Sequence, residues 1–170
     1  MNNWIYKVFL LTFLLSILFT GITSFIAHNT NQLVMLIVIV VVLIISIIFD
    51  VISTSVLTSK ESTFHAMNSK RIKGAKEGLL LIKNNVKVVS VCNDVIGDIL
   101  GIASGGLGAV LAISISLTTG VNVALISIII AAFISALTVG GKAVFKEVAV
   151  KNSDKIVFRV GKIISFMKWK

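Results

Sequence analysis

Four long apolar runs constrain this chain more than any other feature, and they cover residues 8–27, 33–57, 88–117 and 121–141. A bilayer core about 30 Å thick is crossed by about 20 helical residues, and every run reaches that length. Backbone groups in lipid must be satisfied within the protein, so helices are the expected structure. Only 14 % of the residues are charged, against about 25 % in soluble domains, which excludes an ordinary soluble globule. The sequence therefore predicts an all-α polytopic membrane protein with four transmembrane helices.

The basic residues are confined to three places. Lys7 precedes the first run, seven Lys and Arg lie between Lys60 and Lys87, and eight lie between Lys142 and Lys170. Loops rich in Lys and Arg stay on the cytoplasmic side. Four crossings put the N-terminus, the 58–87 loop and the 142–170 tail on that side together. We expect one membrane domain over residues 1–170, in the cell membrane, with both termini cytoplasmic.

The first run could instead be a secretory signal peptide, because Lys7 followed by an apolar stretch fits that pattern. A signal cleavage site needs a small residue two positions before the cut, and Phe25 stands there relative to Ala27. We therefore interpret residues 8–27 as a retained helix.

The loop and the tail both have amphipathic patterns. The stretch from Ser59 to Asn85 is interpreted as a helix with an apolar side and a basic side, as is the tail. Such helices lie on the inner membrane face, where anionic lipid attracts them. We expect membrane lipid as a partner and no nucleic acid. The apolar positions are Leu79, Leu80, Ile82 and Val86 in the loop, and Ile156, Val157, Val160, Ile163, Ile164 and Phe166 in the tail.

Three carboxylates fall inside or at the edge of predicted spans, where each costs on the order of 2.5–3.5 kcal/mol on insertion scales. Asp94 and Asp98 are four residues apart and share a helix face. Asp50 lies about 26 Å from the outer end of its run and Asp98 about 28 Å from that of its own, so their depths are similar. The sequence predicts an oxygen-only site formed by Asp50, Ser53, Asn93, Asp94 and Asp98.

Carboxylate, hydroxyl and amide oxygens suit a hard cation, and Mg²⁺ prefers one or two carboxylates with retained water. No Cys/His cluster favours zinc or copper. No catalytic triad, phosphate loop or metalloprotease motif is present, so we expect no enzyme and no organic cofactor.

Simpler structural explanations of these residues remain open. The three carboxylates could be wetted at the interface and paired with Lys60 or Lys87, because side chains near helix ends reach water cheaply. Gly97, Gly101 and Gly105 have the small-xxx-small spacing of closely packed helices. Packing is also the favoured role of the small residues on the last span, Ser127, Ala131, Ser135 and Thr138.

Three short motifs follow one another between Phe49 and Gly105. The first is Phe49-Asp50-Val51-Ile52-Ser53, and the second is Gly74-Ala75-Lys76-Glu77-Gly78 in the loop. The third is Asn93-Asp94, with Asp98 a few residues later. In order and spacing this region resembles the transmembrane domain of the cyclin-M/CorC family of magnesium transporters.

The resemblance implies a cation-transporting membrane domain that forms a homodimer. Asp50 stands where the family has Ser, Ser53 where it has Glu, and Asp94 and Asp98 where it has Asn, so the carboxylates are redistributed. Residues 1–31 add a span to the family's three-helix layout. The family's cytoplasmic regulatory domains have no counterpart, and nucleotide-linked gating is not expected.

We expect a minimal divalent-cation transporter, with magnesium as the transported ion. The alternative is a non-transporting membrane adaptor or regulator that acts through the basic loop and tail. A holin-like pore former is a third possibility, against which the buried acids argue.

Overall fold

The structure is a computed structural model that describes residues 2–168, and throughout this range the regular elements are helical. The prediction of an all-α chain is confirmed. Four helices are long and apolar enough to cross a membrane, over Tyr6–Ala27, Gln32–Thr58, Asn85–Thr119 and Val123–Lys151. They correspond to the four apolar runs. The last helix continues for ten residues past Gly141, where the apolar run ends, because helical structure does not depend on apolar residues.

The chain forms two compact units. Unit 1 comprises residues 1–47 and 95–141, and unit 2 comprises residues 48–94 and 142–170.

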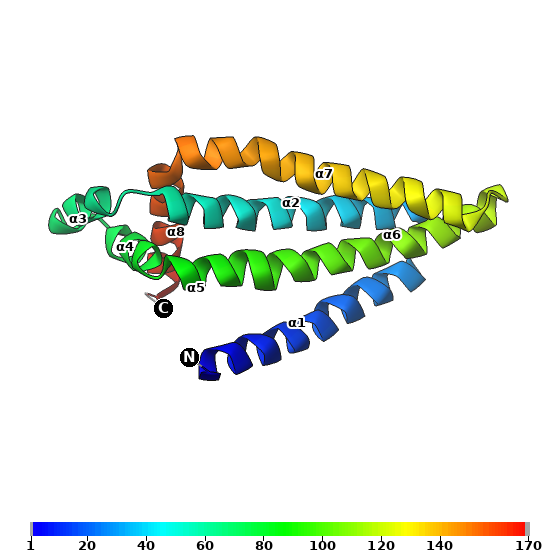
Figure 1. Cartoon of the computed structure of the whole chain (residues 1–170), viewed down its shortest axis with the longest axis horizontal. Helices are drawn as coiled ribbons and strands as arrows, with labels where there is room; N and C mark the ends of the chain where they lie inside the picture. Colours follow the sequence, from blue (N-terminus) through cyan, green and yellow to red (C-terminus); the bar gives the residue numbers. More distant parts are fainter. Residues whose placement is uncertain (1, 169–170) are drawn as a thin grey trace. The chain divides into compact units, whose positions relative to one another are not determined.

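Unit 1 is built from four helices that pack around an apolar core. They are α1 (Asn2–Asn29), the first part of α2 (Gln32–Thr58), α6 (Asp98–Thr119) and the first part of α7 (Val123–Lys151). Figure 1 shows the C-terminal part of α1 beside α6, and the two helices are in contact. The buried core residues are Ala27, Met35, Ile39, Leu43, Leu107 and Leu111, with Ile130 and Ile134 packed against them.

Local chemistry explains where the helices of unit 1 end. Gly120 takes the left-handed conformation, φ +72°, that lets a chain leave a helix, and its amide donates to the Ser116 carbonyl. The Asn122 side-chain oxygen then accepts from the Ala124 amide at 2.8 Å, which caps the start of α7. The chain has no proline that would interrupt a helix.

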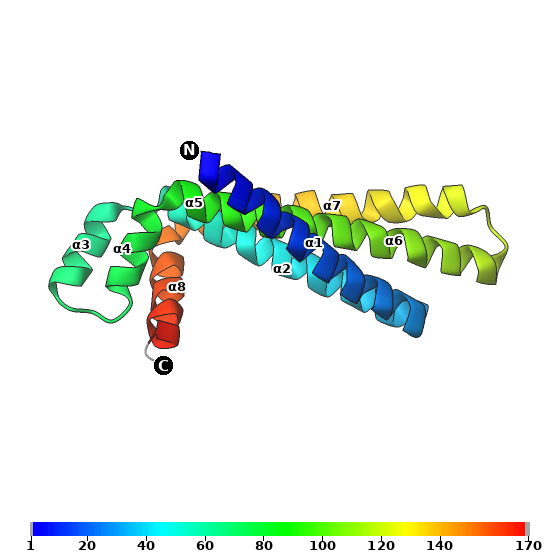
Figure 2. The same ribbon diagram turned by 90° about the horizontal axis from the view of Figure 1, so that it is seen from below.

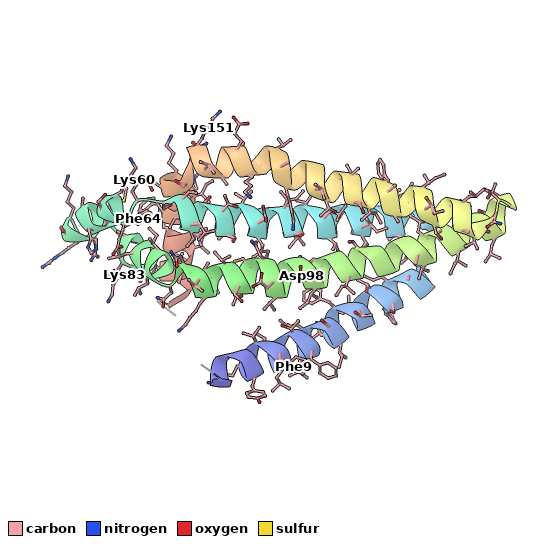
Figure 3. The ribbon with its side chains drawn as sticks, viewed as in Figure 1. Phe9, Lys60, Phe64, Lys83, Asp98 and Lys151 are labelled. Carbon is pink, nitrogen blue, oxygen red and sulfur yellow. The ribbon has the colours of Figure 1, made fainter. Side chains whose placement is uncertain are left out.

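Large apolar side chains cover the outside of unit 1. Phe9 is 72 % exposed and projects from α1 (Figure 3), and Phe25, Leu33 and Ile129 are similarly open. Exposed apolar area of this extent is typical of a surface that faces lipid rather than water. The four apolar helices are compatible with a multi-pass membrane protein.

Unit 2 contains the ends of α2 and α7 together with the helices of the loop and the tail. The loop forms α3 (Glu61–Ser69), α4 (Ala75–Lys83) and α5 (Asn85–Val89), followed by the π-helical segment η1 (Ser90–Gly97), whose last three residues belong to unit 1. The tail forms α8 (Ser153–Lys168). The core of the unit consists of Val56, Phe64, Leu79, Ile82 and Val157. Figure 2 shows α3 and α4 as a hairpin, with α8 alongside α4.

The single amphipathic helix expected over Ser59–Asn85 is wrong, because the stretch breaks into two helices at a turn. Arg71 has φ +54°, and its amide donates to the Asn68 carbonyl while the Ile72 amide donates to Met67. This is the Schellman pattern, which closes a helix at a left-handed residue. Gly74, at φ +92°, then starts α4. Of the apolar side chains expected to form one face, Leu79 and Ile82 are buried, whereas Val86 is 77 % exposed.

Candidate functional site

The predicted site residues lie on three elements of the structure. Asp50 and Ser53 belong to the end of α2, and Asn93 and Asp94 belong to η1, all within unit 2. Asp98 opens α6 in unit 1 and is exposed there (Figure 3). Asp50 is half-buried, and Asp94 is exposed.

The end of α2 carries an unusual density of buried hydroxyl groups. Ser53 and Ser55 are both fully buried, at 0 % exposure, and Thr54 is 8 % exposed. The Ser55 hydroxyl donates to the Ala149 carbonyl of α7, at 3.4 Å, and so links the two helix ends inside unit 2. The Ser53 hydroxyl has no hydrogen-bond partner among the described residues.

Asn93, on η1, also has a buried polar atom without a hydrogen-bond partner. Its side-chain oxygen, Oδ1, is buried and has no partner in the described part of the chain. A buried polar group without a partner costs about 1–3 kcal/mol, and native structures contain few of them. Both buried polar atoms without a partner in the described part of unit 2 are oxygens that could bind a cation. Both belong to residues that the sequence singled out.

The backbone around Asn93 is also unusual. Residues Ser90–Gly97 form a π-helix, in which hydrogen bonds join residues five apart rather than four. Such segments are rare and occur frequently at functional sites. The sequence carried no signal for this widening, and the face expected to be shared by Asp94 and Asp98 assumed α-helical steps. Within η1 that assumption is wrong.

No group of three or more His, Cys, Asp and Glu that could hold a metal ion is present among residues 2–168. A cation at the end of α2 or on η1 would thus depend on neutral oxygens and retained water together with single carboxylates. His65 is exposed and pairs with Glu61 at 3.2 Å, as a solvated side chain rather than a ligand.

The small-residue faces of α6 and α7 meet within unit 1 but do not fill the space between them. A groove of about 410 Å³ opens there. Gly101 and Gly105 border open space, whereas a methyl group added at Gly108 would come within 2.6 Å of the Ile134 side chain. Close packing inside the unit therefore occurs at Gly108 and not at Gly101 or Gly105. Ser127, Ala131, Ser135 and Thr138 line the groove from α7.

The sequence missed one polar contact that organises unit 2. Asp154, in the first turn of α8, accepts hydrogen bonds from the Lys60 amide and the Thr63 hydroxyl, both at 3.0 Å. These bonds satisfy the start of α3 and join the tail to the loop. An acidic residue at the start of an otherwise basic helix is the signal that could have pointed to it.

No protein-family model, curated protein or solved structure matches the chain. The resemblance to the cyclin-M/CorC transmembrane domain accordingly stays a prediction from the residue pattern.

Proposed function

We propose that the chain is a minimal divalent-cation transporter whose cargo is magnesium. The observation that carries the proposal is that two buried oxygen atoms of unit 2, Ser53 Oγ and Asn93 Oδ1, have no hydrogen-bond partner among the described residues. A hard cation, directly or through its water, would satisfy both atoms and recover the cost of their burial.

The proposed ligands of unit 2 are Asp50, Ser53, Asn93 and Asp94, with one carboxylate on each of the two elements. One or two carboxylates with neutral oxygens and retained water form the ligand set that Mg²⁺ prefers. Asp98, exposed at the start of α6 in unit 1, remains a candidate from the sequence pattern alone. Membrane carboxylates mark ion pathways in many transporters, which supports transport over simple storage.

The proposal includes a homodimer in the cell membrane, with both termini in the cytoplasm. The dimer rests on the resemblance, and the orientation rests on the distribution of Lys and Arg.

The test is magnesium binding to the purified full-length protein in detergent, measured by calorimetry. Asp50→Asn and Asp94→Asn should each abolish saturable binding while helix content stays unchanged. Glu147→Gln is a matched control, because Glu147 is a carboxylate of unit 2 whose partner is Lys151. Magnesium uptake into proteoliposomes should follow the same ranking. Wild-type affinity in Asp50→Asn would refute the site.

A further inference from the structure

Helix α8 has two distinct faces. On the inner face Val157 is fully buried in the core of unit 2, and Gly161 lies against α4 so closely that a methyl group there would contact the Gly74 carbonyl oxygen. The outer face combines three basic side chains with three apolar ones, all exposed. We call it the α8 outer face, and it consists of Lys155, Arg159, Lys162, Ile163, Phe166 and Met167.

The apolar part of this face is too open to be a core contact. Ile163 is 61 % exposed, Phe166 83 % and Met167 75 %. Apolar side chains interleaved with Lys and Arg are typical of helices that lie in the plane of a membrane interface, where the apolar atoms enter the acyl boundary and the cations meet anionic headgroups.

A second basic segment adjoins the outer face. Gly74 packs against the backbone of Lys162, since a methyl group on Gly74 would lie 2.7 Å from its Cα. The α3–α4 turn, residues 70–74, therefore ends beside the last turns of α8. This turn carries Lys70, Arg71 and Lys73 around Ile72, which is 40 % exposed.

Three carboxylates of unit 2 have partners outside the α8 outer face. Asp154 accepts its two hydrogen bonds from α3, and Glu61 pairs with His65 and Lys83. Glu147 pairs with Lys151. An anionic surface would complement the exposed Lys155, Arg159 and Lys162 of the α8 outer face.

We propose that the α8 outer face and the α3–α4 turn together form a docking surface for anionic lipid headgroups of the membrane. Nucleic acid would engage the cations but leave Phe166 and Met167 in water, whereas a lipid interface accommodates both kinds of side chain. The proposal does not depend on the cation site. It requires that the protein lie in a membrane, and the four apolar helices are compatible with that.

The test places an environment-sensitive fluorophore on the outer face of the full-length protein. Cys92, the single cysteine, is replaced in Cys92→Ser, and Met167→Cys provides the labelling position. The labelled protein is reconstituted in nanodiscs of phosphatidylcholine, with or without phosphatidylglycerol. We expect blue-shifted emission, quenched by a lipid-attached quencher, in the anionic discs, and we expect added salt to reverse it.

Charge variants measure the strength of docking. Each Lys or Arg near an anionic surface is worth about a fivefold change in the docked-to-undocked ratio. The triple variant K155Q/R159Q/K162Q should therefore lower that ratio about a hundredfold. The control K60Q/K83Q/K151Q removes the same net charge from exposed lysines of unit 2 that belong neither to α8 nor to the α3–α4 turn, and it should dock as the parent does. Figure 3 labels these three lysines.

Two results would overturn the proposal. One is identical emission in neutral and anionic nanodiscs. The other is an equal loss of docking in the two triple variants, which would indicate a response to net charge alone.

Discussion

Two buried serines, two positions apart on α2, differ in their hydrogen bonding. Ser53 and Ser55 are both fully buried, but only the Ser55 hydroxyl donates to a partner, the Ala149 carbonyl. Removing a hydroxyl that lacks a partner relieves an unfavourable burial, whereas removing a bonded one leaves an acceptor unsatisfied. Variants of the two serines therefore distinguish a structural role from the proposed ligand role.

We expect Ser53→Ala to leave the magnesium-free protein as stable as the parent, or more stable, and to weaken magnesium binding. Ser55→Ala should lower the free energy of unfolding by about 0.5–1.5 kcal/mol, toward the low end because its bond is long, and keep the affinity. Thermal unfolding with and without magnesium in detergent measures both effects. If Ser53→Ala binds magnesium like the parent, the hydroxyl is not a ligand.

Helix α8 is held against α4 by glycine at both sides of the contact. A methyl group at position 161 would lie 2.8 Å from the Gly78 amide nitrogen and closer still to the Gly74 carbonyl oxygen. Backbone atoms cannot move aside as the end of a flexible side chain can, so the approach requires a residue without Cβ at this position. Within the α3–α4 hairpin, the ring of Phe64 packs directly against Gly78, where a Cβ would meet it. Figure 3 labels Phe64.

Gly161→Ala should separate α8 from α4 and cost about 1–3 kcal/mol, the usual range for overpacking. Limited proteolysis should then release the tail sooner than in the parent. Gly105→Ala is the matched control, because Gly105 is also helical but borders open space. It should be neutral, or stabilising by up to about 1 kcal/mol through helix propensity. Equal protease resistance in both variants would contradict a tight α4–α8 contact.

At the scale of the whole molecule, the distribution of basic residues predicts how the chain would cross a membrane. Sixteen Lys and Arg lie outside the 8–59 and 88–141 segments, and the turn at Gly120 and Asn122 carries no ionisable side chain. Positive charge is retained on the cytoplasmic side during insertion. The α6–α7 turn is therefore expected on the opposite side from α4 and α8.

Single-cysteine labelling in a Cys92→Ser background tests this topology. A membrane-impermeant maleimide added to intact cells should label Asn122→Cys and should label Lys76→Cys and Lys155→Cys only after permeabilisation. All of these positions are exposed, so access to the reagent depends on sidedness and not on burial. Labelling of Asn122→Cys and Lys76→Cys from the same side would exclude four crossings.

The sequence by itself determined the helical class of the protein and the four long apolar segments. These properties depend on hydrophobicity and on the absence of proline, which add up locally along the chain. The same information named Ser53 and Asn93 as candidate residues, because polar atoms are conspicuous against an apolar background. It did not indicate which polar atoms would lack a partner.

Only the tertiary structure decided the features that depend on what another segment supplies. Ser53 and Ser55 are alike in sequence, and the Ala149 carbonyl distinguishes them. Gly105 and Gly161 are likewise both helical glycines, yet only Gly161 faces a neighbouring backbone. The break of the loop at Arg71 and the π-helix at Ser90–Gly97 also departed from the local pattern. Packing energy between segments outweighs differences in local propensity of less than about 1 kcal/mol per residue, so these features could not be read from spacing alone.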